Sequence, residues 1–187
     1  MRTIALTAAV LALGVAGCNS PEPAADTTDT AAAQSPTPAA PTNQATATLQ
    51  DADGKAVGTA TATQAGGTVA ISVKVNGLAP GEHGVHVHMT GSCEAPDFKS
   101  AGGHWNPSNQ GHGLDAPAGQ HAGDMPNLTV AADGTGTLTY QLVGGTFAGL
   151  MDADGSAFVV HAMKDDQTSD PSGDSGDRIA CGVFTAG

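Results

Sequence analysis

The sequence is poor in aromatic residues and in positive charge. Its 187 residues include only four Phe, one Tyr and one Trp, but 26 Gly and 11 Pro, a composition that argues against long packed helices. Six Lys and Arg stand against 18 Asp and Glu, and the formal net charge is −12. This charge excludes nucleic acid as a partner, because its phosphates would be repelled. Seven His and three Cys carry most of the chemical information.

The N-terminal segment contains no apolar run long enough to span a bilayer comfortably. Residues 1–17 instead predict an export signal, with a short basic start and the apolar stretch IALTAAVLALGVAG. The stretch ends in VAGC at 15–18, which resembles a bacterial lipobox, so we expect lipidation of Cys18 and a membrane-anchored lipoprotein of the cell envelope or periplasm. Ordinary signal cleavage next to a coincidental cysteine is the alternative. Residues 18–43 are rich in Pro, Ala and Thr without apolar periodicity, and predict a disordered tether.

No segment shows a helical period over ten residues or more, and from residue 44 onward apolar residues instead recur at every second position. In TVAISVKV (68–75), for example, four apolar side chains share one face. This pattern predicts an antiparallel sandwich or barrel over 44–187. Residues 90–126 and 163–177 break the pattern and predict two long functional loops. The expected strands are 46–50, 56–63, 68–75, 83–89, 127–132, 135–143, 157–163 and 178–184.

The stretch GEHGVHVHMTG (81–91) alternates histidine with valine. Residues two apart on a strand point the same way, about 6–7 Å apart along the chain. His86 and His88 therefore share one face, while Val85 and Val87 enter the core. Two imidazoles at this separation can converge on one metal ion, although an isolated H-x-H is also compatible with two surface histidines.

The other histidines favour the metal interpretation. Three histidines and an aspartate follow within Gly- and Pro-rich chain, at separations of 8, 9 and 3: His104, His112, His121 and Asp124. Three imidazoles and one carboxylate form a closed four-coordinate set suited to zinc. His161 lies in the apolar segment AFVVHAM, where an unpaired imidazole would be costly.

Five segments resemble the signature segments of the copper/zinc superoxide dismutase family in the same order. They are GEHGVHVH, GGHWNP, HGLDAPAGQHAGDMPNL, VVHAMKDD and GDRIACGV, and the resemblance covers about residues 44–187. It implies an all-β, eight-stranded antiparallel Greek-key barrel with two long functional loops. It also implies one copper and one zinc per subunit, and the disproportionation of superoxide to dioxygen and hydrogen peroxide.

The resemblance also implies a role for each matching residue. His104 would bridge the two metals and pass a proton to the product, and Arg178 would hold the anionic substrate beside the copper. Asp165 would tie a copper histidine to a zinc histidine, and His83 would brace the loop by hydrogen bonds. Copper would be held by His86, His88, His104 and His161, zinc by His104, His112, His121 and Asp124, and a disulfide would join Cys93 to Cys181.

Two functional alternatives remain beside the enzyme. A non-catalytic lipoprotein of the same fold would bind or buffer copper or zinc without dismutation. A cupin oxygenase also begins from H-x-H, but Glu94 lies one residue beyond its usual spacing. The sequence leaves open whether the protein is a monomer or a homodimer. Because the loop 163–177 is strongly acidic, we expect weak long-range steering of superoxide, with attraction left to the metals, Arg178 and Lys99.

Overall fold

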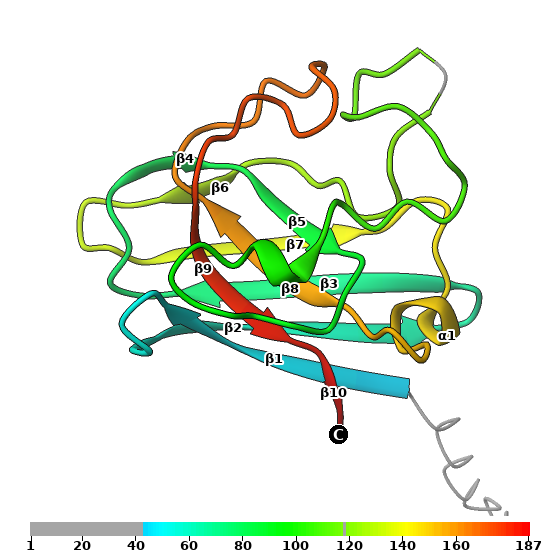
Figure 1. Cartoon of the computed structure of the whole chain (residues 1–187), viewed down its shortest axis with the longest axis horizontal. Helices are drawn as coiled ribbons and strands as arrows, with labels where there is room; N and C mark the ends of the chain where they lie inside the picture. The colour runs from blue at the N-terminus through cyan, green and yellow to red at the C-terminus, as the bar shows by residue number, and fades with distance from the viewer. Residues whose placement is uncertain (1–42, 118) are drawn as a thin grey trace, which may run out of the picture. The chain divides into compact units, whose positions relative to one another are not determined.

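The computed structural model describes residues 43–117 and 119–187, which form a domain whose regular secondary structure is almost entirely antiparallel strands (Figure 1). The predicted export signal, nearly all of the tether and Cys18 lie outside the described residues. The first strand begins at Asn43, one residue before the predicted start of the domain. Within the described ranges, no helix has the length and hydropathy needed to cross a bilayer.

Each of the eight predicted segments contains a strand. The segment 83–89 was predicted as one strand, but the structure divides it at Gly84 into the end of one strand and the whole of the next. Two short helices lie between strands, η1 (Lys99–Ala101) and α1 (Phe147–Leu150). The strands are β1 (Asn43–Asp51), β2 (Ala56–Ala65), β3 (Thr68–Val75), β4 (Gly81–His83), β5 (Val85–His88), β6 (Leu128–Val130), β7 (Gly136–Gln141), β8 (Ala157–His161), β9 (Arg178–Val183) and β10 (Thr185–Ala186).

The sheet closes into a barrel through residues 81–88. Its strand order is β4-β6-β7-β3-β2-β1-β9-β8-β5, and the two end strands follow each other directly in the chain. β4 pairs with β6 and β5 pairs with β8, so the same stretch of chain completes both ends of the path. β4 and β5 do not lie beside β3, which precedes them, and this skipped connection is typical of a Greek key. The structure thus confirms the predicted all-β barrel.

The alternating pattern places the core inside this barrel. In β3, Val69, Ile71, Val73 and Val75 are buried, while Ser72 and Lys74 point outward. Val85 and Val87 of β5 are fully buried in the same core, as predicted. Burying each such aliphatic side chain stabilises the fold by about 1.5–3 kcal/mol, before chain entropy is counted.

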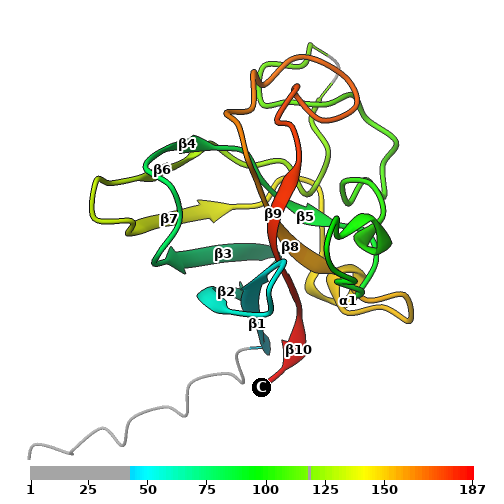
Figure 2. The same ribbon diagram turned by 60° about the vertical axis from the view of Figure 1, so that its left-hand side comes forward.

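The two long loops cover the outer face of the barrel at β5. β5 pairs with β8 along one edge. Along the other edge it bonds to loop backbone, because β6 pairs with β4 and β7 and not with β5. The Val87 amide donates to Gly123 over 3.0 Å, and the Trp105 amide donates to Val87 over 2.8 Å. Segments 106–117 and 162–177 lie side by side at one end of the barrel in both ribbon views (Figures 1 and 2). His86 and His88 are consequently buried on the outer face as well.

Candidate metal centre

Four imidazoles converge on the outer face of the barrel. They come from β5 (His86 and His88), the end of β8 (His161) and the first long loop (His104), and all four are buried. One ring nitrogen from each lies within 4.8 Å of the others. The His86 and His104 rings are nearest, with centroids 3.8 Å apart.

The free nitrogens of these rings identify the point on which they converge. Within the described ranges, His86 Nδ1 and the Nε2 atoms of His88, His104 and His161 are buried without a hydrogen-bond partner. A buried polar atom without a partner is costly, so four of them in one place fit a metal ion. The opposite ring nitrogens of three are fixed, since His88 Nδ1 lies 3.0 Å from the Gly102 carbonyl and His161 Nδ1 lies 3.2 Å from that of Gly176, while His86 Nε2 faces a carboxylate. Such partners set the tautomer and aim the free nitrogen.

A second group shares the His104 ring. Asp124 Oδ1 lies 2.9 Å from His104 Nδ1 and 3.2 Å from the Nδ1 atoms of both His112 and His121. Asp124 is completely buried, and its Oδ2 accepts from the Gly113 and His121 amides over 2.8 and 3.0 Å. Three imidazole nitrogens and one carboxylate oxygen are the donor set that a tetrahedral zinc site uses. His104 therefore turns Nδ1 toward this group and Nε2 toward the four-histidine group.

Asp165 links the two groups from behind. Its Oδ2 lies 2.6 Å from His86 Nε2, and its Oδ1 lies 3.1 Å from His112 Nε2. Sequence reasoning missed the residue that holds Asp165: the Asn127 side chain donates to its carbonyl over 2.9 Å and accepts from its amide over 2.8 Å. The sequence carries no local signal of this pairing, because 38 residues separate the two.

The pKa of His112 shifts in the opposite direction from the pKa values of His86 and His161. Burial lowers the pKa of His86 to about 3 and that of His161 to about 4, so these rings stay neutral, as metal ligation requires. Burial alone would also lower the pKa of His112, but Asp124 and Asp165 outweigh it and raise the pKa to about 9. Burial would raise the pKa of Asp124, yet the surrounding histidines hold it well below its usual range.

Arg178 lies beside the four-histidine group and is held by backbone carbonyls. Its guanidinium donates to Phe98 O over 2.8 Å and to Gly102 O over 2.7 Å. It lines a cavity of about 360 Å³ together with His104 and His161. It also lines an adjoining cavity of about 430 Å³, bordered by two lysine or arginine side chains and two carboxylates: Lys99, Arg178, Asp97 and Asp177.

Lys99 contributes less attraction than the sequence suggests. Its ammonium lies 3.0 Å from the Asp97 carboxylate, and both side chains are exposed, with 79% and 56% of their surface accessible. An exposed pair of this kind is strongly screened, so most of the Lys99 charge is offset locally.

The predicted disulfide joins the first long loop to β9. Cys93 and Cys181 are bonded, and 88 residues separate them in the chain. Cys181 lies within the sheet, opposite Gln50 of β1 and Val159 of β8. The bond therefore fastens the loop that carries the Arg178 acceptors to the strand that carries Arg178 itself.

His83 belongs neither to the four-histidine group nor to the group that contains Asp124, as predicted. Its ring is buried, with Nδ1 2.8 Å from the His161 carbonyl and Nε2 2.9 Å from the Ala79 carbonyl. The ring thus joins the chain before β4 to the end of β8.

Comparison with known proteins adds a family to this geometry. Residues 56–184 match the family described as copper/zinc superoxide dismutase. The chain is 38% identical to the superoxide dismutase-like protein YojM of Bacillus subtilis, over 98% of this chain and 96% of that protein. It is 44% identical to the Cu-Zn superoxide dismutase of Caulobacter vibrioides, over 71% of this chain and 80% of that one. A solved double mutant of a SOD-like protein from Bacillus subtilis, with a tyrosine and a proline replaced by histidines, superposes with a TM-score of 0.68 at 43% identity, covering 74% of this chain and 95% of that one.

Proposed function

Since the chain belongs to the copper/zinc superoxide dismutase family, we propose that it disproportionates superoxide to dioxygen and hydrogen peroxide. One observation carries this proposal. Four buried imidazole nitrogens without protein partners converge beside Arg178, and one of these rings is shared with a second, carboxylate-containing group.

The donor atoms support one metal assignment for each group. The four-histidine group offers only nitrogen and suits copper, while the group with Asp124 suits zinc. We assign copper to His86, His88, His104 and His161, and zinc to His104, His112, His121 and Asp124. Bound copper would supply reversible one-electron exchange with superoxide, chemistry that zinc does not offer.

The substrate-binding role falls to Arg178. Its guanidinium keeps a full positive charge and borders both cavities, so a small anion entering either one meets it. Its two carbonyl acceptors fix the plane of the fork, which means that the anion is oriented as well as attracted.

The proton-transfer role falls to His104. It borders the 360 Å³ cavity, and its Nε2 makes no hydrogen bond to the described part of the chain. Asp124 holds the opposite nitrogen, so the ring stays in position whichever state Nε2 adopts. We expect His104 Nε2 to carry the proton that passes to the reduced product.

Two variants test this assignment. In metal-loaded protein, Arg178→Ala should retain copper but lose about 10²-fold in kcat/KM, by analogy with removal of one electrostatic stabiliser. Arg178→Lys is the matched control, since it keeps the charge but not the fork. His161→Ala should lose copper itself, measured by metal analysis. Fully loaded wild-type protein that is no more active than its Arg178→Ala variant would refute the assignment.

A metal-binding protein without turnover is the second candidate. The observation favouring it is that two similar proteins from Bacillus subtilis are named only superoxide dismutase-like or SOD-like, and one of these structures carries two introduced histidines. This chain forms both groups from its own residues, which favours the enzyme. Stoichiometric loading of both metals without dismutation would reverse that preference.

We also propose that the domain acts in the cell envelope as a lipoprotein anchored at Cys18, on the strength of the signal-like residues 1–17. Incorporation of labelled fatty acid in cells, lost in a Cys18→Ala variant, would support this. Light scattering of the unlipidated protein would decide between a monomer and a homodimer.

A further inference from the structure

Gln167 holds a backbone conformation that few residues other than glycine adopt. Its φ is +66°, in the left-handed region, and it lies two residues after Asp165 in the acidic loop 163–177. A strained residue of this kind persists only where its surroundings fix it, and such residues gather at functional sites. The contacts of Gln167 therefore indicate which part of the site it serves.

The main chain of Gln167 lies against one side of the group that contains Asp124. Its amide donates to Asp165 Oδ1 over 2.6 Å, and the same oxygen lies 3.1 Å from His112 Nε2. Its carbonyl accepts from the Asp115 amide over 3.4 Å. A Cβ built on Gly113 would overlap the Gln167 carbonyl, so the chain directly after His112 can approach this closely only as glycine.

The side chain of Gln167 joins two segments that carry proposed zinc ligands. Its Oε1 accepts from the Leu114 amide over 3.3 Å, and its Nε2 donates to the Met125 carbonyl over 3.2 Å. Leu114 lies two residues after the proposed ligand His112. Met125 directly follows the proposed ligand Asp124. A single side-chain amide therefore spans the two segments.

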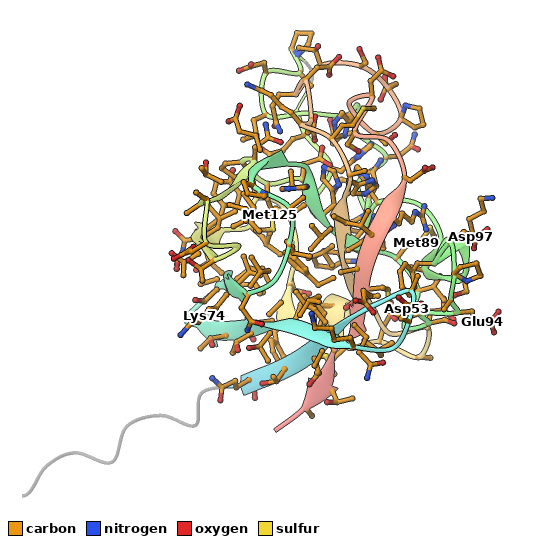
Figure 3. All side chains as sticks on the ribbon, turned by 90° about the vertical axis from the view of Figure 1, so that its left-hand side faces the viewer. Asp53, Lys74, Met89, Glu94, Asp97 and Met125 are labelled. Carbon is orange, nitrogen blue, oxygen red and sulfur yellow. A yellow bond between two sulfur atoms is a disulfide. The ribbon has the colours of Figure 1, made fainter. Side chains whose placement is uncertain are left out.

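The barrel holds these two segments unequally. The Met125 side chain is completely buried in the hydrophobic core, and Figure 3 shows it among the strands. Leu114 is only half-buried, and Asp115 is exposed. Gln167 thus ties the segment with the weaker packing to the segment that is anchored in the core.

We infer that Gln167 is a positioning residue for zinc, which fixes the separation between the ligand atoms of His112 and Asp124 before the ion binds. This inference rests on the proposed assignment of zinc to this group. A ligand set that is already held in place binds its metal more tightly, because less conformational freedom is lost on binding.

The test is zinc affinity, measured on the metal-free full-length chain by competition with a chromophoric chelator. Gln167→Met keeps the length of the side chain and removes both of its hydrogen bonds. We expect its dissociation constant for zinc to rise about tenfold, a partial loss because the Gly113 amide still donates to Asp124. Gln167→Gly removes the same bonds and suits the left-handed backbone, so it should show the same loss without a risk to folding.

A spectroscopic measurement separates positioning of the ligands from stability of the loop. Co(II) bound in place of zinc reports the ligand geometry through its visible absorption bands, which should weaken and shift in both variants. Gln141→Met is the matched control, because it removes a glutamine side-chain bond to Thr68 on the barrel. It should leave the zinc affinity and the Co(II) bands unchanged.

Three outcomes would overturn the inference. Zinc affinities of both variants within about twofold of the wild type would show that the side chain of Gln167 does not position the ligands. Weaker zinc binding with unchanged Co(II) bands would show a loss of loop stability instead. Wild-type protein that binds neither zinc nor Co(II) would refute the proposed metal assignment itself, a result distinct from the other two.

Discussion

The disulfide between Cys93 and Cys181 should account for a large part of the stability of the metal-free domain. It closes a loop whose ends are 88 residues apart. The chain-entropy model then gives about 4–5 kcal/mol of stabilisation, because the unfolded chain loses freedom that the folded chain has already lost. At about 2–4 °C per kcal/mol for a domain of this size, its removal should lower Tm by about 8–20 °C.

Urea unfolding of the metal-free protein measures this effect. Trp105 is the one tryptophan of the chain and is 94% buried, since only 6% of its surface is exposed, so its fluorescence reports global unfolding. The comparison is between oxidised protein and a Cys93→Ala/Cys181→Ala variant, both with Cys18 replaced by alanine to remove the third thiol.

The Cys18→Ala protein after chemical reduction is the matched control, because reduction breaks the bond without changing Cys93 or Cys181. Reduced protein and the double variant should unfold at similar urea concentrations. A difference of less than about 1 kcal/mol between oxidised and reduced protein would refute the reasoning, since strain or residual structure would then cancel the entropy.

Three further predictions concern the metal centre. Asp165→Asn should weaken zinc binding by about 10–100-fold in a chelator competition, because the carboxylate orients His112; Asp166→Asn, its exposed neighbour, is the control, and equal affinities would refute the role. Zinc needs neutral His112, whose pKa is raised to about 9, so its binding should release about one proton at pH 7 and tighten as the pH rises toward 9. Calorimetry in two buffers counts that proton, and a count near zero would contradict the prediction. For dismutation, kcat/KM should stay nearly flat with added salt, because two carboxylates border the cavity beside Arg178; a steep fall would show that steering is strong.

The strands could be predicted because their signal is local. In β3, four buried residues alternate with outward-facing ones, and the period alone identifies the buried face. The division at Gly84 could not be predicted, since residues 81–88 read as one uninterrupted alternation and the change of partner depends on where β6 and β8 lie. A Cβ on Gly84 would lie 2.8 Å from the Cβ of Ser175, a neighbour 91 positions away that no local pattern reveals.

The site also has residues that the sequence reveals and residues that it does not. Histidines and carboxylates are visible in the sequence because few other residue types offer metal-binding atoms, and the family resemblance sorted them into two sets. The acceptors that hold Arg178 are the carbonyls of Phe98 and Gly102, and backbone carbonyls are present in every residue, so no sequence pattern marks them. The two hydrogen bonds between the Asn127 side chain and the Asp165 backbone join two loops. They could not be predicted, because only the folded barrel brings these loops together.

Closure of the barrel and presentation of the imidazoles fall on the same residues, 81–88, but use different atoms. Peptide groups form the ladders with β6 and β8, while the rings of His86 and His88 project away from them. Substitution of a ligand histidine in a related protein therefore leaves the strand pairing that closes the barrel in place. The hydrogen bonds that close the barrel use no atom of either ring, so these bonds are the same whichever metal the rings bind.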